Sequence, residues 1–261
     1  MRKNKLFIFL LILILSVSCL SSIAFGHSIN IASDDTELNW YFVNRGKDTL
    51  PECPKEATGL LSKYDAYYLG DTNEKVVYLT FDEGYENGYT DEILDVLKEK
   101  NVKAIFFVTS HYIVYSPDTV KRMVDEGHVV ANHTKHHYSM PSVTYSNEVF
   151  SKELTDVEDR FKELTGKDMP KFFRPPMGKY SQKSLAMTKD LGYQTVFWSF
   201  AYGDYEPNNQ PSTYYAKKHI LGHLHDGSIL LLHAISKTNA QVLGEVIDEA
   251  RSNGYEFYLL P

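Results

Sequence analysis

The feature that most constrains the fold is a regular alternation of strand-like and helix-like segments, which begins at Lys75 and continues to the C-terminus. The strand-like segments are nearly continuous runs of apolar or β-prone residues, as expected of strands that are covered on both faces. Strands are predicted at Val76–Phe81, Ala104–Val108, His128–Asn132, Lys171–Phe173, Thr195–Trp198, Ser228–Leu232 and Glu256–Leu260. Strands that alternate with helices form parallel sheets, so the pattern predicts an α/β fold.

The segments between these strands carry helix signals. Pro117–Glu126 begins with a proline, which is common at the first position of a helix, and stops before Gly127. Ser146–Thr165 places its apolar residues along one helix face and is followed by Gly166. Further helices are predicted at Asp91–Lys100, Ser181–Leu191, Tyr214–Leu221 and Asn239–Ser252. These connections predict a distorted (β/α) barrel of about seven parallel strands, and a doubly wound open sheet is the alternative.

The N-terminus has the layout of a secretory signal. A basic start is followed by an apolar run over Leu6–Val17 and then by small residues. The run is short for a membrane span, which needs about 20 residues. We therefore expect residues 1–26 to be a signal peptide that is cleaved after Gly26, or a retained membrane anchor. Lipid attachment at Cys19 is disfavoured, because Ser16 stands where a lipoprotein signal has an aliphatic residue.

The remaining chain fits one catalytic domain with a short extension. Residues 27–70 lack clear periodicity, so we expect an N-terminal extension that packs on a domain spanning 71–261. The net charge of −7 excludes the basic footprint of a nucleic-acid-binding protein. Cys53 is the only cysteine after residue 26, so no internal disulfide can form there.

Polar residues suited to metal-assisted hydrolysis follow several of the predicted strands. They are Asp82, Glu83, His133, His137, Arg174, Asp204 and His233. In barrels of parallel strands the strand ends converge on one face, and that face holds the chemistry. Each residue alone has an ordinary alternative, such as a solvated acidic turn or a core histidine. Their joint position at strand ends favours a single site.

His133 and His137 are four residues apart, a spacing that can place two imidazoles on one metal ion. A nearby carboxylate would complete two nitrogen and one or two oxygen ligands and leave room for water, as in catalytic zinc sites. Adjacent residues on a strand point to opposite sides, so Asp82 and Glu83 can both face one site only if the chain has begun to turn there.

These motifs, taken together, resemble the NodB-type polysaccharide deacetylases, which form carbohydrate esterase family 4. The resemblance runs from Lys75 to the C-terminus, and its motifs are Thr80–Gly84, His133–His137, Phe173–Pro176, Phe200–Tyr205 and Leu231–His233. Within the family, the segments Tyr64–Gly70, Leu79–Thr90 and Gln194–Ser199 are similar to the delta-lactam-biosynthetic de-N-acetylases of spore-forming bacteria.

The resemblance implies a catalytic role for each polar residue of the motifs. Asp82 would be the catalytic base, and Arg174 would hold it in place. His233 would be the catalytic acid, and Asp204 would tune it. His133 and His137 would bind a divalent metal ion, expected to be zinc.

Two further positions carry over with smaller roles, and three residues depart from the family pattern. The main-chain N–H of Met177 would bind the oxyanion, and Leu231 would line the acetyl pocket. Glu83 stands where the family usually has an aspartate as the third metal ligand. Ala201 replaces an acidic residue, and Tyr205, a candidate substrate contact, replaces a tryptophan. These changes put a direct copy of the family's charge network in doubt.

The function implied is metal-dependent removal of the N-acetyl group from N-acetylmuramic acid in peptidoglycan, which leads to muramic δ-lactam in the spore cortex. A muramoyl amidase would act first, and we expect a monomer that is secreted or membrane-anchored and faces the cell wall. One alternative is deacetylation of N-acetylglucosamine in peptidoglycan or of another polysaccharide. Another is a catalytically weak glycan-binding protein. A glycoside hydrolase needs two carboxyl groups but leaves the three histidines unexplained.

Overall fold

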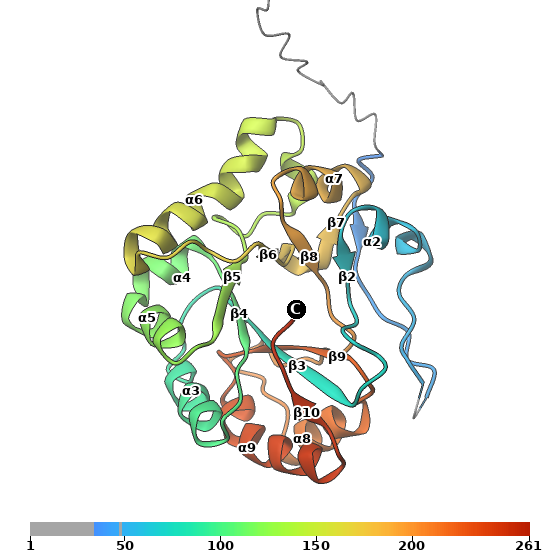
Figure 1. Ribbon diagram of the computed structural model, residues 1–261, viewed down its shortest axis with the longest axis vertical. Helices are drawn as coiled ribbons and strands as arrows, with labels where there is room; N and C mark the ends of the chain where they lie inside the picture. The colour runs from blue at the N-terminus through green and yellow to red at the C-terminus, as the bar shows by residue number, and fades with distance from the viewer. Residues whose placement is uncertain (1–33, 47–48) are drawn as a thin grey trace, which may run out of the picture. The chain divides into compact units, whose positions relative to one another are not determined.

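A curled sheet of parallel strands forms the centre of the protein (Figure 1). The structure is a computed structural model that describes residues 34–46 and 49–261, so the predicted signal segment lies outside the described residues. Within these ranges eight strands make up the main sheet. They are β2 (Ala66–Tyr67), β3 (Val76–Glu83), β4 (Ile105–Val108), β5 (Val129–Asn132), β6 (Phe172–Phe173), β8 (Gln194–Val196), β9 (Ser228–His233) and β10 (Glu256–Phe257).

The strand order explains why the barrel is distorted. The sheet runs β10-β3-β4-β5-β6-β8-β2, and every pairing in it is parallel. Strand β9 lies outside this order and pairs in parallel with β3 along Val77–Asp82. Among the described residues, β9 forms no ladder with β2 or β8, and isolated bridges from Leu69 to Ser228 and from Phe200 to Leu230 connect the two sides. The predicted distorted (β/α) barrel is confirmed, and the doubly wound open sheet is not observed.

All seven predicted strands are present, with ends that coincide with the prediction or differ from it by up to three residues. The prediction missed β2, which pairs with β8 and therefore places Ala66 and Tyr67 in the main sheet. This strand has two residues, too few to show an alternating pattern. A second, two-stranded sheet pairs β1 (Leu38–Asn39) antiparallel with β7 (Lys179–Tyr180).

Helices cover the outside of the sheet (Figure 1). The described α-helices are α2 (Leu60–Lys63), α3 (Thr90–Glu99), α4 (Ser110–Tyr115), α5 (Pro117–Asp125), α6 (Asn147–Thr165), α7 (Gln182–Asp190), α8 (Thr213–Gly222) and α9 (Lys237–Ser252). Short 3-10 helices occur at Lys55–Ala57, Met140–Val143 and Pro176–Gly178. The ends of α6 follow the predicted signals, because the Ser146 side chain caps Val149 N–H and Gly166 adopts a φ of 72°.

The strand pattern divides the core into two layers. Along β3, Val77, Leu79 and Phe81 pack outward against the helices. Val76 and Tyr78 point into the barrel, where they join residues of the other strands and Leu260. Because successive side chains alternate, Asp82 falls on the inner side and Glu83 on the outer side. No helix within the described ranges is long and apolar enough to span a membrane.

Candidate active site

A cavity of about 990 Å³ lies at the carboxyl ends of the strands. Its lining includes seven of the ten residues singled out from the sequence: Asp82, His133, His137, Met177, Tyr205, Leu231 and His233. Arg174 and Asp204 lie directly behind it as hydrogen-bond partners of lining residues. Aromatic side chains, among them Tyr85, Tyr138 and Trp198, form much of the remaining wall. Such a wall suits a sugar ring, which stacks on aromatic faces.

Asp82 is held by a buried arginine. Nη1 of Arg174 donates to Oδ1 of Asp82 at 2.8 Å, and Nε donates to the Val196 carbonyl at 3.1 Å. The guanidinium of Arg174 is fully buried and lies 4.2 Å from the centre of the Phe107 ring. Burial alone would raise the pKa of Asp82, but Arg174 and the nearby histidines outweigh it and hold that pKa below its ordinary value. Asp82 is therefore ionised at neutral pH.

A tight turn after β5 presents the two histidines. Thr134 and His137 both have positive φ angles, 70° and 59°, an unfavourable conformation for residues with side chains. Two hydrogen bonds support it: Asn132 Oδ1 accepts from Thr134 N–H, and Thr134 Oγ1 accepts from His137 N–H. The imidazole rings of His133 and His137 lie 5.0 Å apart between centres.

Helix α6 holds the same turn through hydrogen bonds. The Glu153 carboxylate, which is buried, accepts hydrogen bonds from the main-chain N–H of His136 at 2.9 Å and from its imidazole Nδ1 at 2.6 Å. His136 therefore ties the turn to α6, and it also lines the cavity together with His133 and His137.

His133 has the properties of a metal ligand. Its Nδ1 lies 2.8 Å from the carbonyl oxygen of Arg174, which can only accept a hydrogen bond. Nδ1 therefore carries the hydrogen, and Nε2 keeps its lone pair. That Nε2 lies 3.5 Å from Oδ2 of Asp82. Burial lowers the pKa of His133 to about 4 and also lowers the pKa of His137, so both rings are neutral, the form that binds metal.

Glu83 does not line the cavity. Strand β3 continues through Glu83, whose main chain still pairs with β4, so its side chain points to the helix side, away from Asp82. It is fully buried, and neither carboxylate oxygen has a hydrogen-bond partner among residues 34–46 and 49–261. Burial, reinforced by the charges of Glu86 and Asp82, raises the pKa of Glu83 well above its ordinary value. The structure therefore does not bring the expected third ligand to the two histidines.

The two imidazoles fit a divalent metal, although the described part of the chain contains no group of three His, Cys, Asp or Glu side chains arranged to hold one. Neutral rings, one of them oriented by a carbonyl, are what a catalytic zinc site uses. A carboxylate oxygen, Oδ2 of Asp82, lies 3.5 Å from Nε2 of His133. Coordination positions beyond these residues would fall to water or substrate.

The imidazole of His233 is held by the carboxylate of Asp204. Its Nδ1 lies 2.7 Å from Oδ1 of Asp204, which is fully buried. Burial opposes a charge on His233, but the carboxylates of Asp204 and Asp82 together outweigh it and leave the pKa of His233 above its ordinary value. His233 can therefore carry a proton at neutral pH, and its Nε2 is the nitrogen left for a substrate.

Asn239 and Tyr202 complete this network, and the sequence did not identify their role. Asn239 Nδ2 donates to Oδ2 of Asp204 at 2.7 Å and to the His233 carbonyl at 3.0 Å. The Tyr202 hydroxyl donates to Oδ1 of Asn239, which fixes the orientation of the amide. Asn239 lies in the first turn of α9, where polar residues are common, so nothing in the sequence indicated that it belongs to the site.

The three predicted substrate contacts lie around the same cavity. Met177 is about half exposed and has φ 59° and ψ 10°. The Tyr205 ring lies 6.0 Å from that of His233 at an angle of 70°. Leu231, two residues before His233 on β9, is buried and lines the cavity. These positions match contact with a bound sugar and its acetyl group.

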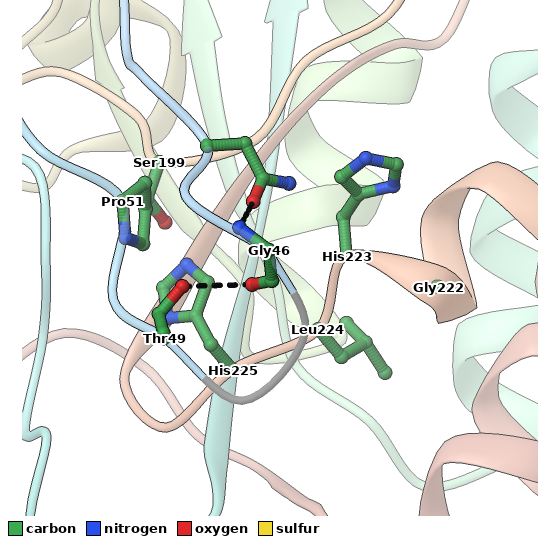
Figure 2. A pocket seen from close by; sticks show the side chains of 9 residues that line it. Gly46, Thr49, Pro51, Ser199, Gly222, His223, Leu224 and His225 are labelled. Carbon is green, nitrogen blue, oxygen red and sulfur yellow. Dashed lines mark hydrogen bonds between the residues drawn. The ribbon is translucent and has the colours of Figure 1, made fainter.

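A much smaller cavity, of about 10 Å³, is lined by Asn44, Gly46, Thr49 and Pro51 on one side and by the end of α8 on the other (Figure 2). The imidazole of His225 lies beside it, and its Nε2 is buried without a hydrogen-bond partner among the described residues. Space for about one water molecule is enough to hydrate this nitrogen. None of the catalytic candidates lines this cavity.

Comparisons with known proteins agree with this geometry. The sequence profile described as polysaccharide deacetylase matches residues 69–196. The peptidoglycan-N-acetylmuramic acid deacetylase PdaA of Bacillus subtilis is 42% identical over 243 residues, which cover 93% of this chain and 92% of that protein. A peptidoglycan-N-acetylglucosamine deacetylase of Bacillus cereus is 32% identical over 77% of this chain and 72% of its own length.

A solved structure shows the same fold. The structure of Bacillus subtilis PdaA, described as a family 4 carbohydrate esterase, superposes with a TM-score of 0.83 and covers 86% of this chain and 95% of that chain. The chain belongs to the polysaccharide deacetylase family, carbohydrate esterase family 4.

Proposed function

From this family membership we propose that the protein removes the N-acetyl group from N-acetylmuramic acid residues in peptidoglycan glycan strands. The observation that carries the proposal is one cavity lined by an ionised aspartate (Asp82), two neutral histidines (His133 and His137) and a histidine of raised pKa (His233). The choice of sugar is supported by the identity to an enzyme named for that substrate.

Asp82 is proposed as the base that takes a proton from the attacking water. Its Oδ1 is occupied by Arg174, so Oδ2 is the oxygen left to accept the proton. Its lowered pKa keeps it ionised, and the fixed arginine keeps it from turning. Positioned acid–base groups contribute about 10² to 10⁴-fold to a rate.

His133 and His137 are proposed to hold a divalent metal ion, and zinc suits a ligand set rich in imidazole that leaves positions open. A metal bound there would polarise the acetyl carbonyl and make the attacking water more acidic. The main-chain N–H of Met177, which lies on the cavity wall, would donate to the oxyanion as the tetrahedral intermediate forms. Leu231 would contact the acetyl methyl group.

His233 is proposed as the acid that protonates the leaving amine. Because Asp204 holds Nδ1, the proton is delivered from Nε2. The amine of the sugar is a poor leaving group unless it is protonated, so this step is needed for the amide bond to break. Tyr205 would stack on the sugar ring beside His233.

The biological setting follows from the substrate chemistry. Deacetylation of muramic acid frees an amine that can close onto the lactyl carboxylate as a δ-lactam, provided that a muramoyl amidase has first removed the peptide stem. We propose that the protein acts in this way in the spore cortex, as a monomer. It would be secreted or membrane-anchored outside the cytoplasm through residues 1–26, since its substrate lies there.

A second candidate is deacetylation of N-acetylglucosamine in the same strands. It is favoured by the similarity to the Bacillus cereus enzyme named for that activity and by a cavity wall of aromatic residues, which stack on either sugar. The two sugars differ in the lactyl group, so a direct comparison of substrates separates them.

Acetate release from glycan strands tests the proposal. The substrates are strands treated with an amidase, untreated strands, and N-acetylglucosamine oligomers, each assayed with added zinc and with a chelator. We expect zinc-dependent acetate release from amidase-treated strands and its near loss in Asp82→Asn. New reducing ends without acetate would instead show glycosidic cleavage. Binding without any product would show a glycan-binding protein, and acetate from the oligomers alone would establish the second candidate.

A further inference from the structure

We propose that the N-terminal segment Asp35–Trp40 is a positioning strap for the active site. It ties together two loops of the cavity rim that follow different strands of the barrel. One loop follows the metal-binding histidines, and the other carries Met177. The inference rests on the proposed function, because the loops it holds carry groups of that reaction.

The last part of the strap, Leu38–Trp40, contacts the segment that follows Met177 through its main chain. Strand β1 pairs antiparallel with β7, with Leu38 opposite Tyr180 and Asn39 opposite Lys179. The next amide, that of Trp40, donates to the Gly178 carbonyl at 2.8 Å. The strap thus continues the hydrogen bonding up to the residue directly after Met177.

The Trp40 side chain also contacts the backbone and rings next to Gly178. Its indole Nε1 donates to the Trp198 carbonyl at 2.9 Å, and its ring stacks on Phe197 at 4.2 Å and 14°. Gly178, at φ +65°, lies between the two tryptophans. A Cβ there would be 2.8 Å from the Trp198 ring and 3.1 Å from Trp40 Cβ. The backbone next to Met177 is therefore tightly enclosed, and the strap forms one of the two walls.

Carboxylates of the strap reach the second loop. Glu37 accepts from Ser139 Oγ with Oε2 at 2.5 Å and from Lys179 Nζ with Oε1 at 2.6 Å. One side chain therefore bridges the loop that follows His137 and the loop that follows Met177.

Asp35 repeats this arrangement. Its Oδ2 accepts from Thr144 Oγ1 at 2.5 Å, and its Oδ1 accepts from Ser181 Oγ at 3.0 Å. Thr144 and Ser181 lie further along the same two loops, so two carboxylates make the same bridge twice.

Both loops begin at residues in strained conformations. His137 and Met177 are non-glycine residues with a φ of 59° each, and both line the cavity. Strained residues persist only where the surrounding structure holds them. The Met177 amide must also aim at an oxyanion, and a misplacement of about 1 Å in a positioned group can cost about 10²-fold in rate. Loosening the strap should therefore slow the chemical step more than it weakens substrate binding.

Three variants test this role. Glu37→Ala removes one bridge, and Trp40→Phe keeps an aromatic ring on Phe197 but loses the indole hydrogen bond. Glu52→Gln is the matched control, because Glu52 is an exposed N-terminal carboxylate whose side chain pairs with Arg45 rather than with either loop. We expect both strap variants to lower kcat by about tenfold with KM and zinc affinity within about threefold, and the control to match the wild type. Wild-type kcat in both strap variants would overturn the proposal.

Hydrogen exchange gives a readout that does not depend on activity. In Glu37→Ala, amides in residues 139–145 and 177–181 should exchange at least about tenfold faster, while those of β3 and β9 stay unchanged. Unchanged exchange in both loops, or equal acceleration throughout the protein, would refute the strap. If the loops loosen but the wild-type protein releases no acetate from any glycan, the strap stands and the proposed function fails.

Discussion

Replacing Asp204 with asparagine tests the proposed acid, because it preserves the shape of the side chain and changes only charge and hydrogen bonding. One carboxylate oxygen, Oδ1, accepts a hydrogen bond from Nδ1 of His233. The other, Oδ2, accepts from the main-chain N–H of His233 and from Nδ2 of Asn239. An asparagine has only one oxygen to offer. The arrangement that loses fewest bonds keeps this oxygen on the two N–H donors and turns the NH2 group toward Nδ1 of His233. Nδ1 must then be an acceptor, so the imidazolium form is disfavoured.

The expected size of the effect follows from the lost bond. A hydrogen bond to a charged group contributes about 1.5–3 kcal/mol, and one pKa unit corresponds to about 1.4 kcal/mol. The pKa of His233 should therefore fall by about 1 to 2 units. The wild-type pKa of His233 is raised, so its proton is present at low pH and is lost as pH rises through that pKa. In Asp204→Asn this alkaline loss of activity moves to lower pH. Because the protonated fraction of His233 falls by at most tenfold per pKa unit, kcat at neutral pH should fall by up to about 10- to 100-fold.

The assay is acetate release from amidase-treated strands across the pH range in which histidine titrates. We expect activity of the variant to recover in part at the acidic end, where His233 regains its proton. Asp190→Asn, a change at the exposed end of α7, serves as the control for loss of an acidic residue. An unshifted alkaline midpoint in Asp204→Asn, with folding intact, would show that Asp204 does not tune the acid.

Three further variants test other parts of the site. Glu83→Gln should leave zinc affinity unchanged. Relative to the wild type, this variant should become more stable as pH rises above about 4.3, by about 1.4 kcal/mol per pH unit, because the folded wild type keeps Glu83 neutral while its unfolded chain ionises. Urea unfolding at several pH values measures the difference in stability. A difference that does not depend on pH would contradict the raised pKa. His137→Ala should weaken zinc binding by more than about 100-fold in calorimetry, since losing even a partner of a ligand costs about 10–100-fold; retained affinity would exclude this residue as a ligand. Tyr205→Ala should raise KM by about three- to tenfold with little change in kcat, as an aromatic contact contributes about 0.5–1.5 kcal/mol; an unchanged KM would place the sugar elsewhere.

The barrel was predictable from sequence because its strands are buried on both faces and therefore read as continuous apolar runs. Because these apolar runs end at Asp82, His133 and His233, the sequence also showed that the three residues lie at strand ends, which converge on one face of a barrel. The pairing of Asp82 with Arg174 and of His233 with Asp204 was implied by the family resemblance, and the structure shows both contacts.

The orientation of Glu83 was not predictable, because it depends on whether β3 ends one residue earlier or later. A shift of one residue moves a side chain to the other face of a strand. Sequence patterns locate strand ends only to within a few residues, so they could not decide this point. The contacts of Asp35, Glu37 and Trp40 were hidden for another reason: they join residues more than 100 positions apart that share no periodic pattern.

The most direct test of the account is the anomalous diffraction of a crystal grown with zinc, recorded on both sides of the zinc absorption edge. We expect one strong peak between the rings of His133 and His137, next to Oδ2 of Asp82, with the Glu83 carboxylate still turned toward the helices. A zinc-saturated crystal in which those two rings bear no peak, or in which the peak is bound by Glu83, would contradict the site described here.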